Sequence, residues 1–277
     1  MSIDALPYTV LILLAEFSVG CLLVLVAVDL RGLVVPSFVK LGAGLVLAGA
    51  ALTLLTALQV EAVSDIDGFR VDSDLVSPMR GLFAAFLAAT VLYSFFVLRG
   101  DRPRSLGTGV LASAVGLAAL GLTAYVFSLP TWGVAGPLLS LLAGSLVLGG
   151  ATVAMVWGHW YLVTPRLPKR SLEEMTLFLL AVLLLQAALM VLNVALPARE
   201  TPESSGVLSG DLASNPAFWL RVGVGLAFPI ALAYMAWQSS AVKAMMSATG
   251  LLYIAVGAVL SGEALARGLL FVTGVPV

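Results

Sequence analysis

The chain has 277 residues, of which 61% are hydrophobic and 10% are charged, and its formal net charge is −1. Soluble domains carry roughly 25% charged residues, so this composition excludes an ordinary soluble protein, and the near-neutral charge excludes a nucleic-acid-binding protein, which needs a basic face. The chain has one cysteine, Cys21, and one histidine, His159. Within this chain these counts exclude a disulfide framework, a cysteine-held metal cluster and a bis-histidine haem.

Eight apolar runs are long enough to cross a bilayer, which takes about 20 mostly apolar residues. They are Tyr8–Val28, Pro36–Leu58, Gly81–Leu98, Gly107–Phe127, Val134–Val163, Leu172–Leu196, Phe218–Gln238 and Val242–Val272. Because the runs stay apolar on successive residues, they predict helices and not the alternating strands of an outer-membrane barrel. The sequence therefore predicts an all-α integral membrane protein, with one transmembrane domain of eight helices over residues 1–277.

The ends of these runs add two expectations. No lysine or arginine precedes the first run, whereas a cleaved signal peptide starts with basic residues, so we expect this run to be kept as a spanning helix. The fifth and eighth runs are longer than the bilayer requires, which predicts tilt or a water-exposed end turn.

Basic residues gather on one side of the predicted helices. Nine of the fourteen lysines and arginines follow the first, third, fifth and seventh helices: Arg31, Lys40, Arg99, Arg102, Arg104, Arg166, Lys169, Arg170 and Lys243. Acidic residues gather on the other side: Asp4, Glu61, Asp65, Asp67, Asp72, Asp74, Glu200, Glu203 and Asp211. Loops inside the cell carry the excess of lysine and arginine. This pattern predicts a multi-pass protein of the cell inner (cytoplasmic) membrane with both termini outside.

The two longest connections lie on the predicted outer side, at about residues 59–80 and 197–216. Loops of this length are usually contact surfaces or disordered segments. We interpret the outer face as the docking face for a partner protein; the alternative is two solvated loops without a partner. The glycines lie within the apolar runs, where they favour close helix packing over phosphate binding.

Ionisable residues inside a bilayer are costly and indicate function by default. With the predicted orientation, six charged residues fall toward the outer leaflet and are expected to converge on one polar pocket: Glu16, Asp74, Arg80, Arg221, Glu263 and Arg267. Glu263 and Arg267 are four residues apart and therefore share a helix face. Gln186 and Asn193 also share a face of the sixth helix, and His159 falls at the opposite leaflet.

Each of these residues also has a simpler interpretation. Arg80 and Arg221 are expected to be interfacial anchors if they do not join a site, and the Glu263–Arg267 pair then only locks helix packing. Glu16 is either protonated because it is buried or paired with an arginine. His159, beside Trp160 and Tyr161, fits an aromatic belt at the inner interface.

A quinone-ligand or haem-ligand role for His159 is the alternative. Haem b is disfavoured because Met155, on the same helix face, cannot supply the opposite axial ligand. A methionine from another helix, such as Met190, Met235 or Met245, is then needed.

Several short stretches resemble the membrane anchor subunit of dimethyl sulfoxide reductase and the related polysulfide and nitrite reductase membrane subunits. They are Ser77-Pro78-Met79-Arg80, Pro130-Thr131-Trp132 and Gly262-Glu263-Ala264-Leu265-Ala266-Arg267-Gly268, with Glu16 and Gly20 in the first helix and Trp219 and Arg221 at the seventh. The resemblance implies an eight-helix anchor that holds an iron–sulfur electron-transfer subunit and a molybdopterin catalytic subunit, and that oxidises menaquinol.

Three features depart from that family. Asp74 stands where the family has a histidine, the third run has no acidic residue where the family has a glutamate, and Gly158-His159-Trp160-Tyr161 has no counterpart. The resemblance thus implies the fold and the anchoring role more directly than quinol oxidation.

The leading hypothesis is therefore a membrane anchor of a multi-subunit oxidoreductase in anaerobic respiration, bound to membrane lipid and to no nucleic acid. It binds menaquinone or another quinone transiently, through the six charged residues, and holds no metal or covalent cofactor itself. Whether such a subunit counts as an enzyme is left open, because catalysis lies in the partner. The alternatives are a purely structural anchor without quinone chemistry, or a small-solute transporter.

Overall fold

The computed structural model describes residues 5–66, 69–128, 133–164, 167–195 and 212–276. Over these residues, eight helical spans are long and apolar enough to cross a membrane. They are α1 Leu6–Leu30, α2 Pro36–Gln59, α3 Val76–Arg99, α4 Arg102–Val126, α5 Ala135–Val163, α6 Lys169–Ala195, an interrupted span Pro216–Ala241 and α9 Met245–Thr273. The predicted eight apolar helices are confirmed, and by length and composition the chain is a multi-pass membrane protein.

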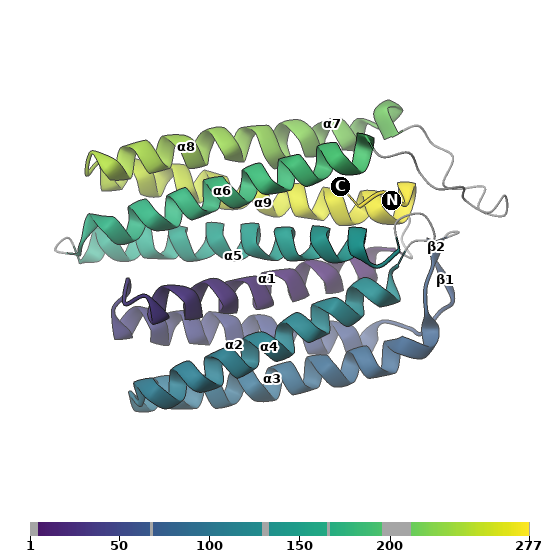
Figure 1. The fold of residues 1–277 in the computed structure, drawn as a ribbon, viewed down its shortest axis with the longest axis horizontal. Coiled ribbons are helices and arrows are strands. Elements are labelled where there is room, and N and C mark those ends of the chain that lie inside the picture. The colour runs from purple at the N-terminus through teal and green to yellow at the C-terminus, as the bar shows by residue number, and fades with distance from the viewer. Residues whose placement is uncertain (1–4, 67–68, 129–132, 165–166, 196–211, 277) are drawn as a thin grey trace.

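The spans pack as two four-helix halves. In the first half α1, α2, α3 and α4 pack in a ring in chain order, and in the second half α5, α6, α8 and α9 do the same. The halves meet mainly through α1 and α5. Figure 1 shows the first half, from purple α1 to teal α4, beside the second half, from teal α5 to yellow α9, with both chain termini at one end of the bundle. We call this end the terminal end.

Small residues bring the two halves into backbone contact. A Cβ atom added to Gly20 of α1 would lie 1.8 Å from the carbonyl oxygen of Ser145 in α5, and one added to Gly149 would lie 2.2 Å from the carbonyl oxygen of Gly20. Only glycine allows such an approach of two helices. The expectation that glycines within the helices serve close packing is confirmed for Gly149, and the contact fixes the face of α1 that turns toward α5.

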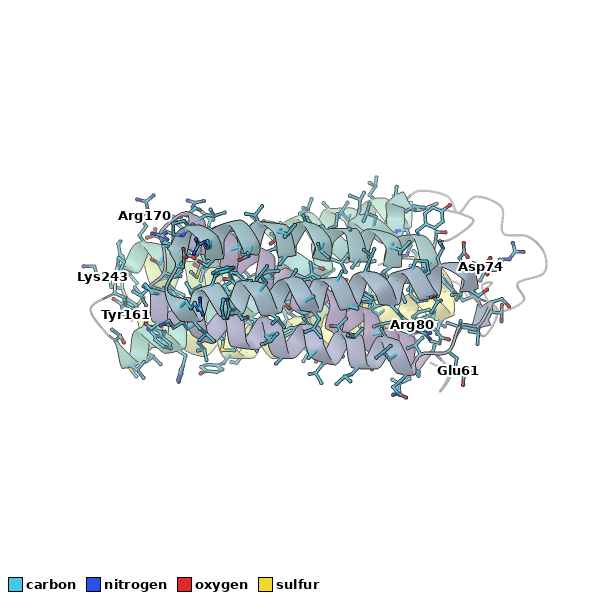
Figure 2. All side chains as sticks on the ribbon, turned by 90° about the horizontal axis from the view of Figure 1, so that it is seen from below. Glu61, Asp74, Arg80, Tyr161, Arg170 and Lys243 are labelled. Carbon is cyan, nitrogen blue, oxygen red and sulfur yellow. The ribbon has the colours of Figure 1, made fainter. Side chains whose placement is uncertain are left out.

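Charged residues sort to the two ends of the bundle. Figure 2 shows Glu61, Asp74 and Arg80 at the terminal end and Arg170 and Lys243 at the opposite end, which we call the basic end. Between them the outward side chains are mostly large and apolar, as for Leu52, Leu55 and Leu58 of α2. Acyl chains can solvate such a surface, whereas its exposure to water is unfavourable in free energy.

Several helices begin earlier than the apolar runs suggested. The third starts at Val76 and not Gly81, because Pro78 suits the first turn of a helix. The fourth starts at Arg102 and not Gly107, because the Asp101 side chain accepts a hydrogen bond from the Arg104 amide and caps it.

The predicted outer loop at residues 59–80 is correspondingly shorter than expected. It holds a small antiparallel hairpin, β1 Asp65–Ile66 and β2 Phe69–Arg70, followed by the 3-10 turn Ser73–Leu75. Most of the second predicted loop, 197–216, lies outside the described residues. After it come the 3-10 turn Leu212–Ser214 and α7, which begins at Pro216.

Candidate functional site

Four charged side chains meet between α1 and the second half of the bundle: Glu16 of α1, Arg221 of α7 (Pro216–Val222), and Glu263 and Arg267 of α9. All four side chains are 0% exposed. Glu16 lies ten residues after the start of α1 and Glu263 ten residues before the end of α9. At 1.5 Å per residue, both lie about 15 Å from the terminal end. We call this group the buried charge cluster.

Arg267 joins the two carboxylates of the cluster. Its Nε donates to Glu16 Oε2 at 3.1 Å, and its Nη2 lies 2.9 Å from Glu16 Oε1. The same Nη2 donates to Glu263 Oε2 at 3.2 Å. Ser140 of α5 accepts two further bonds, from Nη1 to its hydroxyl at 3.0 Å and from Nη2 to its carbonyl at 3.2 Å. The guanidinium thereby ties α1, α5 and α9 together.

Glu263 is the centre of the cluster. Besides Arg267, its Oε1 lies 3.1 Å from Arg221 Nη2 and accepts a hydrogen bond from Gln186 Nε2 of α6 at 2.7 Å. Three helical elements, α6, α7 and α9, therefore meet at this one carboxylate, and α1 and α5 join it through Arg267. Gln186 is buried and belongs to the site, although its sequence pattern indicated only a polar face of the sixth helix.

The cluster balances its own charge. Two carboxylates and two guanidiniums sum to zero when all four are ionised. Removing one partner from a buried ion pair costs about 3–5 kcal/mol because a charge stays buried without compensation. The four residues are thus energetically dependent on one another, and Glu16 is paired with an arginine, one of the two interpretations that the sequence left open.

A glycine makes room for the two carboxylates. A Cβ atom on Gly144 of α5 would lie 2.6 Å from Glu16 Oε1 and 2.6 Å from Glu263 Oε2. Gly144 stands one helical turn after Ser140, so the same face of α5 supplies both the polar contact to Arg267 and the space for the carboxylates. Its position in a glycine-containing apolar run gave no indication of this role.

Arg221 is held by an interruption of the seventh span. Between α7 and α8 (Phe228–Ala241), residues Gly223–Ala227 form a π-helical turn. Pro229 has no amide hydrogen to donate to the carbonyl four residues earlier, that of Gly225. This carbonyl instead accepts from Arg221 Nη1 at 3.3 Å. Arg221 is 0% exposed, so the interpretation as an interfacial anchor is wrong for this residue.

The turn also lets the seventh span touch α9. A Cβ atom on Gly262 would lie 2.4 Å from the Cα of Gly225. This backbone contact places Arg221 beside Glu263, the residue that follows Gly262. Proline and glycine together thus bring the second guanidinium into the cluster.

Two of the six predicted site residues lie outside the cluster. Arg80 of α3 donates from Nε to the carbonyl of Ala57 at 2.9 Å and from Nη2 to the carbonyl of Val60, so it caps the end of α2 in the first half of the bundle. Asp74 is exposed in the turn before α3, and Figure 2 shows both residues at the terminal end. The predicted convergence therefore holds for Glu16, Arg221, Glu263 and Arg267 and is wrong for Arg80 and Asp74.

The remaining polar residues also separate. Asn193, which shares a face with Gln186, donates to the carbonyl of Pro276 at the terminal end. His159 is exposed near the basic end of α5, where its Nδ1 lies 2.8 Å from the Tyr253 hydroxyl. His159 is thus remote from the cluster, as expected. Among the described residues, no group of three or more His, Cys, Asp or Glu side chains is placed to hold a metal.

An open groove of 590 Å³ lies beside the cluster at the terminal end, between α1, α7 and α9. Its walls include Thr9 and Leu13 of α1 and Ala264 and Gly268 of α9, the residues that directly follow Glu263 and Arg267. The Thr9 hydroxyl is buried and has no hydrogen-bond partner in the described part of the chain. Grooves of roughly 300–1,000 Å³ with few polar groups are typical of small-molecule sites.

Comparison with known proteins adds no relative. No protein-family model and no curated protein matches this chain. The resemblance to oxidoreductase anchor subunits therefore stays a prediction from short motifs, and one of them, Pro130-Thr131-Trp132, falls outside the described residues.

Proposed function

We propose that this protein is the membrane anchor subunit of a multi-subunit oxidoreductase, and that a quinone exchanges electrons with the complex in the leaflet at the terminal end. The observation that supports this most is the groove with the unpartnered Thr9 hydroxyl, directly outside the buried charge cluster. The predicted order of short motifs along the chain supports the choice of family. The distribution of basic residues supports an outward-facing terminal end.

The groove offers the contacts that a quinol needs. Its apolar walls suit the ring and the isoprenoid tail of a quinone, and a Thr9 hydroxyl that turns into the groove can hydrogen-bond a quinol oxygen. Oxidation of one quinol releases two electrons and two protons. The electrons leave to the docked iron–sulfur subunit. Glu16 lies seven residues after Thr9, two turns deeper on the same face of α1, and is a candidate acceptor for one proton. The other proton leaves to water at the terminal end.

The proposed docking face is the terminal end. Glu61, Asp72 and Asp74 are exposed there around the β1–β2 hairpin, and they form an acidic surface. A partner subunit with a basic face complements it, because opposite potentials steer association and fix the register of two proteins. This surface contains Asp74, which leaves that residue a role in docking and none in the buried cluster.

Purification of the tagged chain from its native membranes in mild detergent tests the proposal. We expect co-purification of an iron–sulfur subunit and a molybdenum-containing subunit, detected by mass spectrometry and metal analysis, together with extractable quinone. A chain that purifies alone, with no iron, molybdenum or quinone, would contradict the proposal. Solute flux in proteoliposomes made from this chain alone would favour the transporter alternative.

A groove-filling variant tests the quinone step in the same complex. Ala264→Phe places a ring in the groove, and quinol-dependent reduction of the iron–sulfur clusters is expected to fall at least about tenfold, the effect of 1.4 kcal/mol. The matched control is Gly257→Phe, seven residues earlier on the same face of α9, exposed and with open space around it. Equal rates in both variants and the native complex would contradict quinone binding in this groove.

One observation favours a purely structural anchor as the second candidate. The cluster is closed and self-neutral, which is what a lock between helices also requires. In that case the partner subunits co-purify, but quinone is absent and Ala264→Phe has no effect on electron transfer.

A further inference from the structure

A second groove lies at the basic end, on the outer surface of the bundle between α1, α5 and α6. It has a volume of 310 Å³, and nearly all of its walls are apolar, from Val24, Ala27, Leu146, Met175 and Phe178 among others. It is far from the buried charge cluster along the helices, since its α1 wall ends at Arg31, just after Leu30 closes that helix. None of the residues discussed for quinone chemistry lines it.

Two arginines share one carboxylate at the mouth of this groove. Glu174 Oε2 lies 2.6 Å from Arg31 Nη2, and Glu174 Oε1 lies 2.6 Å from Arg170 Nε. The arginine side chains are 63% and 76% exposed, whereas Glu174 is 24% exposed. Figure 2 shows Arg170 at the basic end. One negative and two positive groups leave the mouth with a net charge of +1, and the other nitrogens of both guanidiniums are available to a further acceptor.

We propose that this groove binds an anionic glycerophospholipid, with one acyl chain in the apolar channel and the phosphate on Arg31 and Arg170. The assignment rests on charge complementarity. Guanidinium groups at the membrane surface recognise phosphate oxygens in paired hydrogen bonds, and basic pockets between transmembrane helices select anionic head groups. A net positive mouth favours a lipid with net negative charge over a zwitterionic one. A quinone carries no charge for the arginines to match.

Two substitutions at the mouth are expected to change the lipid affinity in opposite directions. Arg31→Gln lowers the net charge of the mouth to zero. We expect the affinity for phosphatidylglycerol to fall about fivefold, which is the contribution of one arginine at an anionic membrane surface. Glu174→Gln removes the competing carboxylate and frees both guanidiniums, so affinity is expected to rise about fivefold. Lys40→Gln removes another exposed positive charge and is the control for a general loss of charge.

The measurement is native mass spectrometry of the full chain in detergent, titrated with dioleoyl phosphatidylglycerol or dioleoyl phosphatidylcholine. We expect one tightly held phosphatidylglycerol per chain and weaker phosphatidylcholine binding. Ala27→Phe fills the groove from an exposed position and should abolish the tight binding, whereas Ala88→Phe, exposed on α3, should not.

Four results would overturn the proposal. The first is equal affinity for the two lipids. The second is a fall in phosphatidylglycerol affinity with Glu174→Gln, because this would mean that the ion pairs of Glu174 stabilise the protein and do not compete with the lipid phosphate. The third is equal loss of binding in Ala27→Phe and Ala88→Phe. Inorganic phosphate is added as a competitor in the same titration. The fourth is a bound phosphate with no phosphatidylglycerol adduct, which would show that the mouth binds a free anion and not a lipid.

Discussion

Glu263 is expected to be the residue on which the buried charge cluster depends most. Its carboxylate contacts Arg221 at 3.1 Å, Arg267 at 3.2 Å and Gln186 at 2.7 Å. Glu263→Gln keeps the volume, replaces one accepting carboxylate oxygen by a donating amide nitrogen, and leaves the cluster with a net charge of +1. At 3.1 Å and an effective dielectric constant of 20, one ion pair contributes about 5 kcal/mol of attraction. Because Arg267 keeps Glu16, we expect a net loss of about 3–5 kcal/mol in the free energy of unfolding.

The assay is equilibrium unfolding of the purified full chain in mixed micelles, followed by tryptophan fluorescence. Glu173→Gln is the matched control, because Glu173 is 34% exposed and forms a loose ion pair with Lys169 at 3.9 Å. A surface pair of this kind contributes less than about 1 kcal/mol. The double variant Glu263→Gln with Arg221→Gln restores neutrality, and it is expected to be more stable than the sum of the single changes by about 1–3 kcal/mol.

A stability of Glu263→Gln within about 0.5 kcal/mol of the native chain would refute the reasoning. So would single changes that simply add in the double variant, because additivity means that the two side chains do not interact. Either result shows that the four charges of the cluster do not stabilise one another. The packing of α9 against the other helices must then stabilise the bundle without them.

Two further changes test the geometry. Gly144→Val is expected to lower the free energy of unfolding by about 1–3 kcal/mol in the same assay, because its side chain collides with two cluster carboxylates. The control is Gly44→Val, which meets open space on α2 and should cost less than about 1 kcal/mol. Arg80→Gln should cost about 1–3 kcal/mol, since two helix-end carbonyls lose their donor, and leave the quinol KM of the complex unchanged; a raised KM would return Arg80 to the site.

The number of crossings could be predicted from the sequence because a bilayer requires long apolar runs and leaves few other solutions. The depth of each charge could be predicted for the same reason. Depth alone placed six charged residues toward one leaflet, and four of them, Glu16, Arg221, Glu263 and Arg267, do meet. Spacing of four residues also placed Glu263 and Arg267 on one face of their helix.

The neighbours of each helix could not be predicted in this way. In a soluble helix, an apolar stripe shows which face turns inward, but here the faces toward lipid and toward protein are both apolar. Arg80 lies closer to the terminal end and has the wrong neighbours, since α3 lies in the first half of the bundle and contacts α2 and α4. Gln186 lies nine residues before the end of α6 at Ala195, so its depth could have assigned it to the cluster. Pro229 was a further indication of a polar contact inside the seventh span, because a proline within a helix leaves a carbonyl without its backbone donor.

The two carboxylates of the cluster are not equivalent. Glu263 has three charged or polar partners, and its neutralisation would leave Arg221 without a carboxylate among the described contacts. Within the described part of the chain, Glu16 pairs only with Arg267, and Arg267 keeps Glu263 as a partner if Glu16 takes up a proton. Glu16 also belongs to the helix that lines the groove through Thr9 and Leu13. If a quinol delivers a proton to this cluster, Glu16 accepts it at the lower electrostatic cost. Stability and proton exchange are therefore expected to depend on different residues, the first on Glu263 and the second on Glu16.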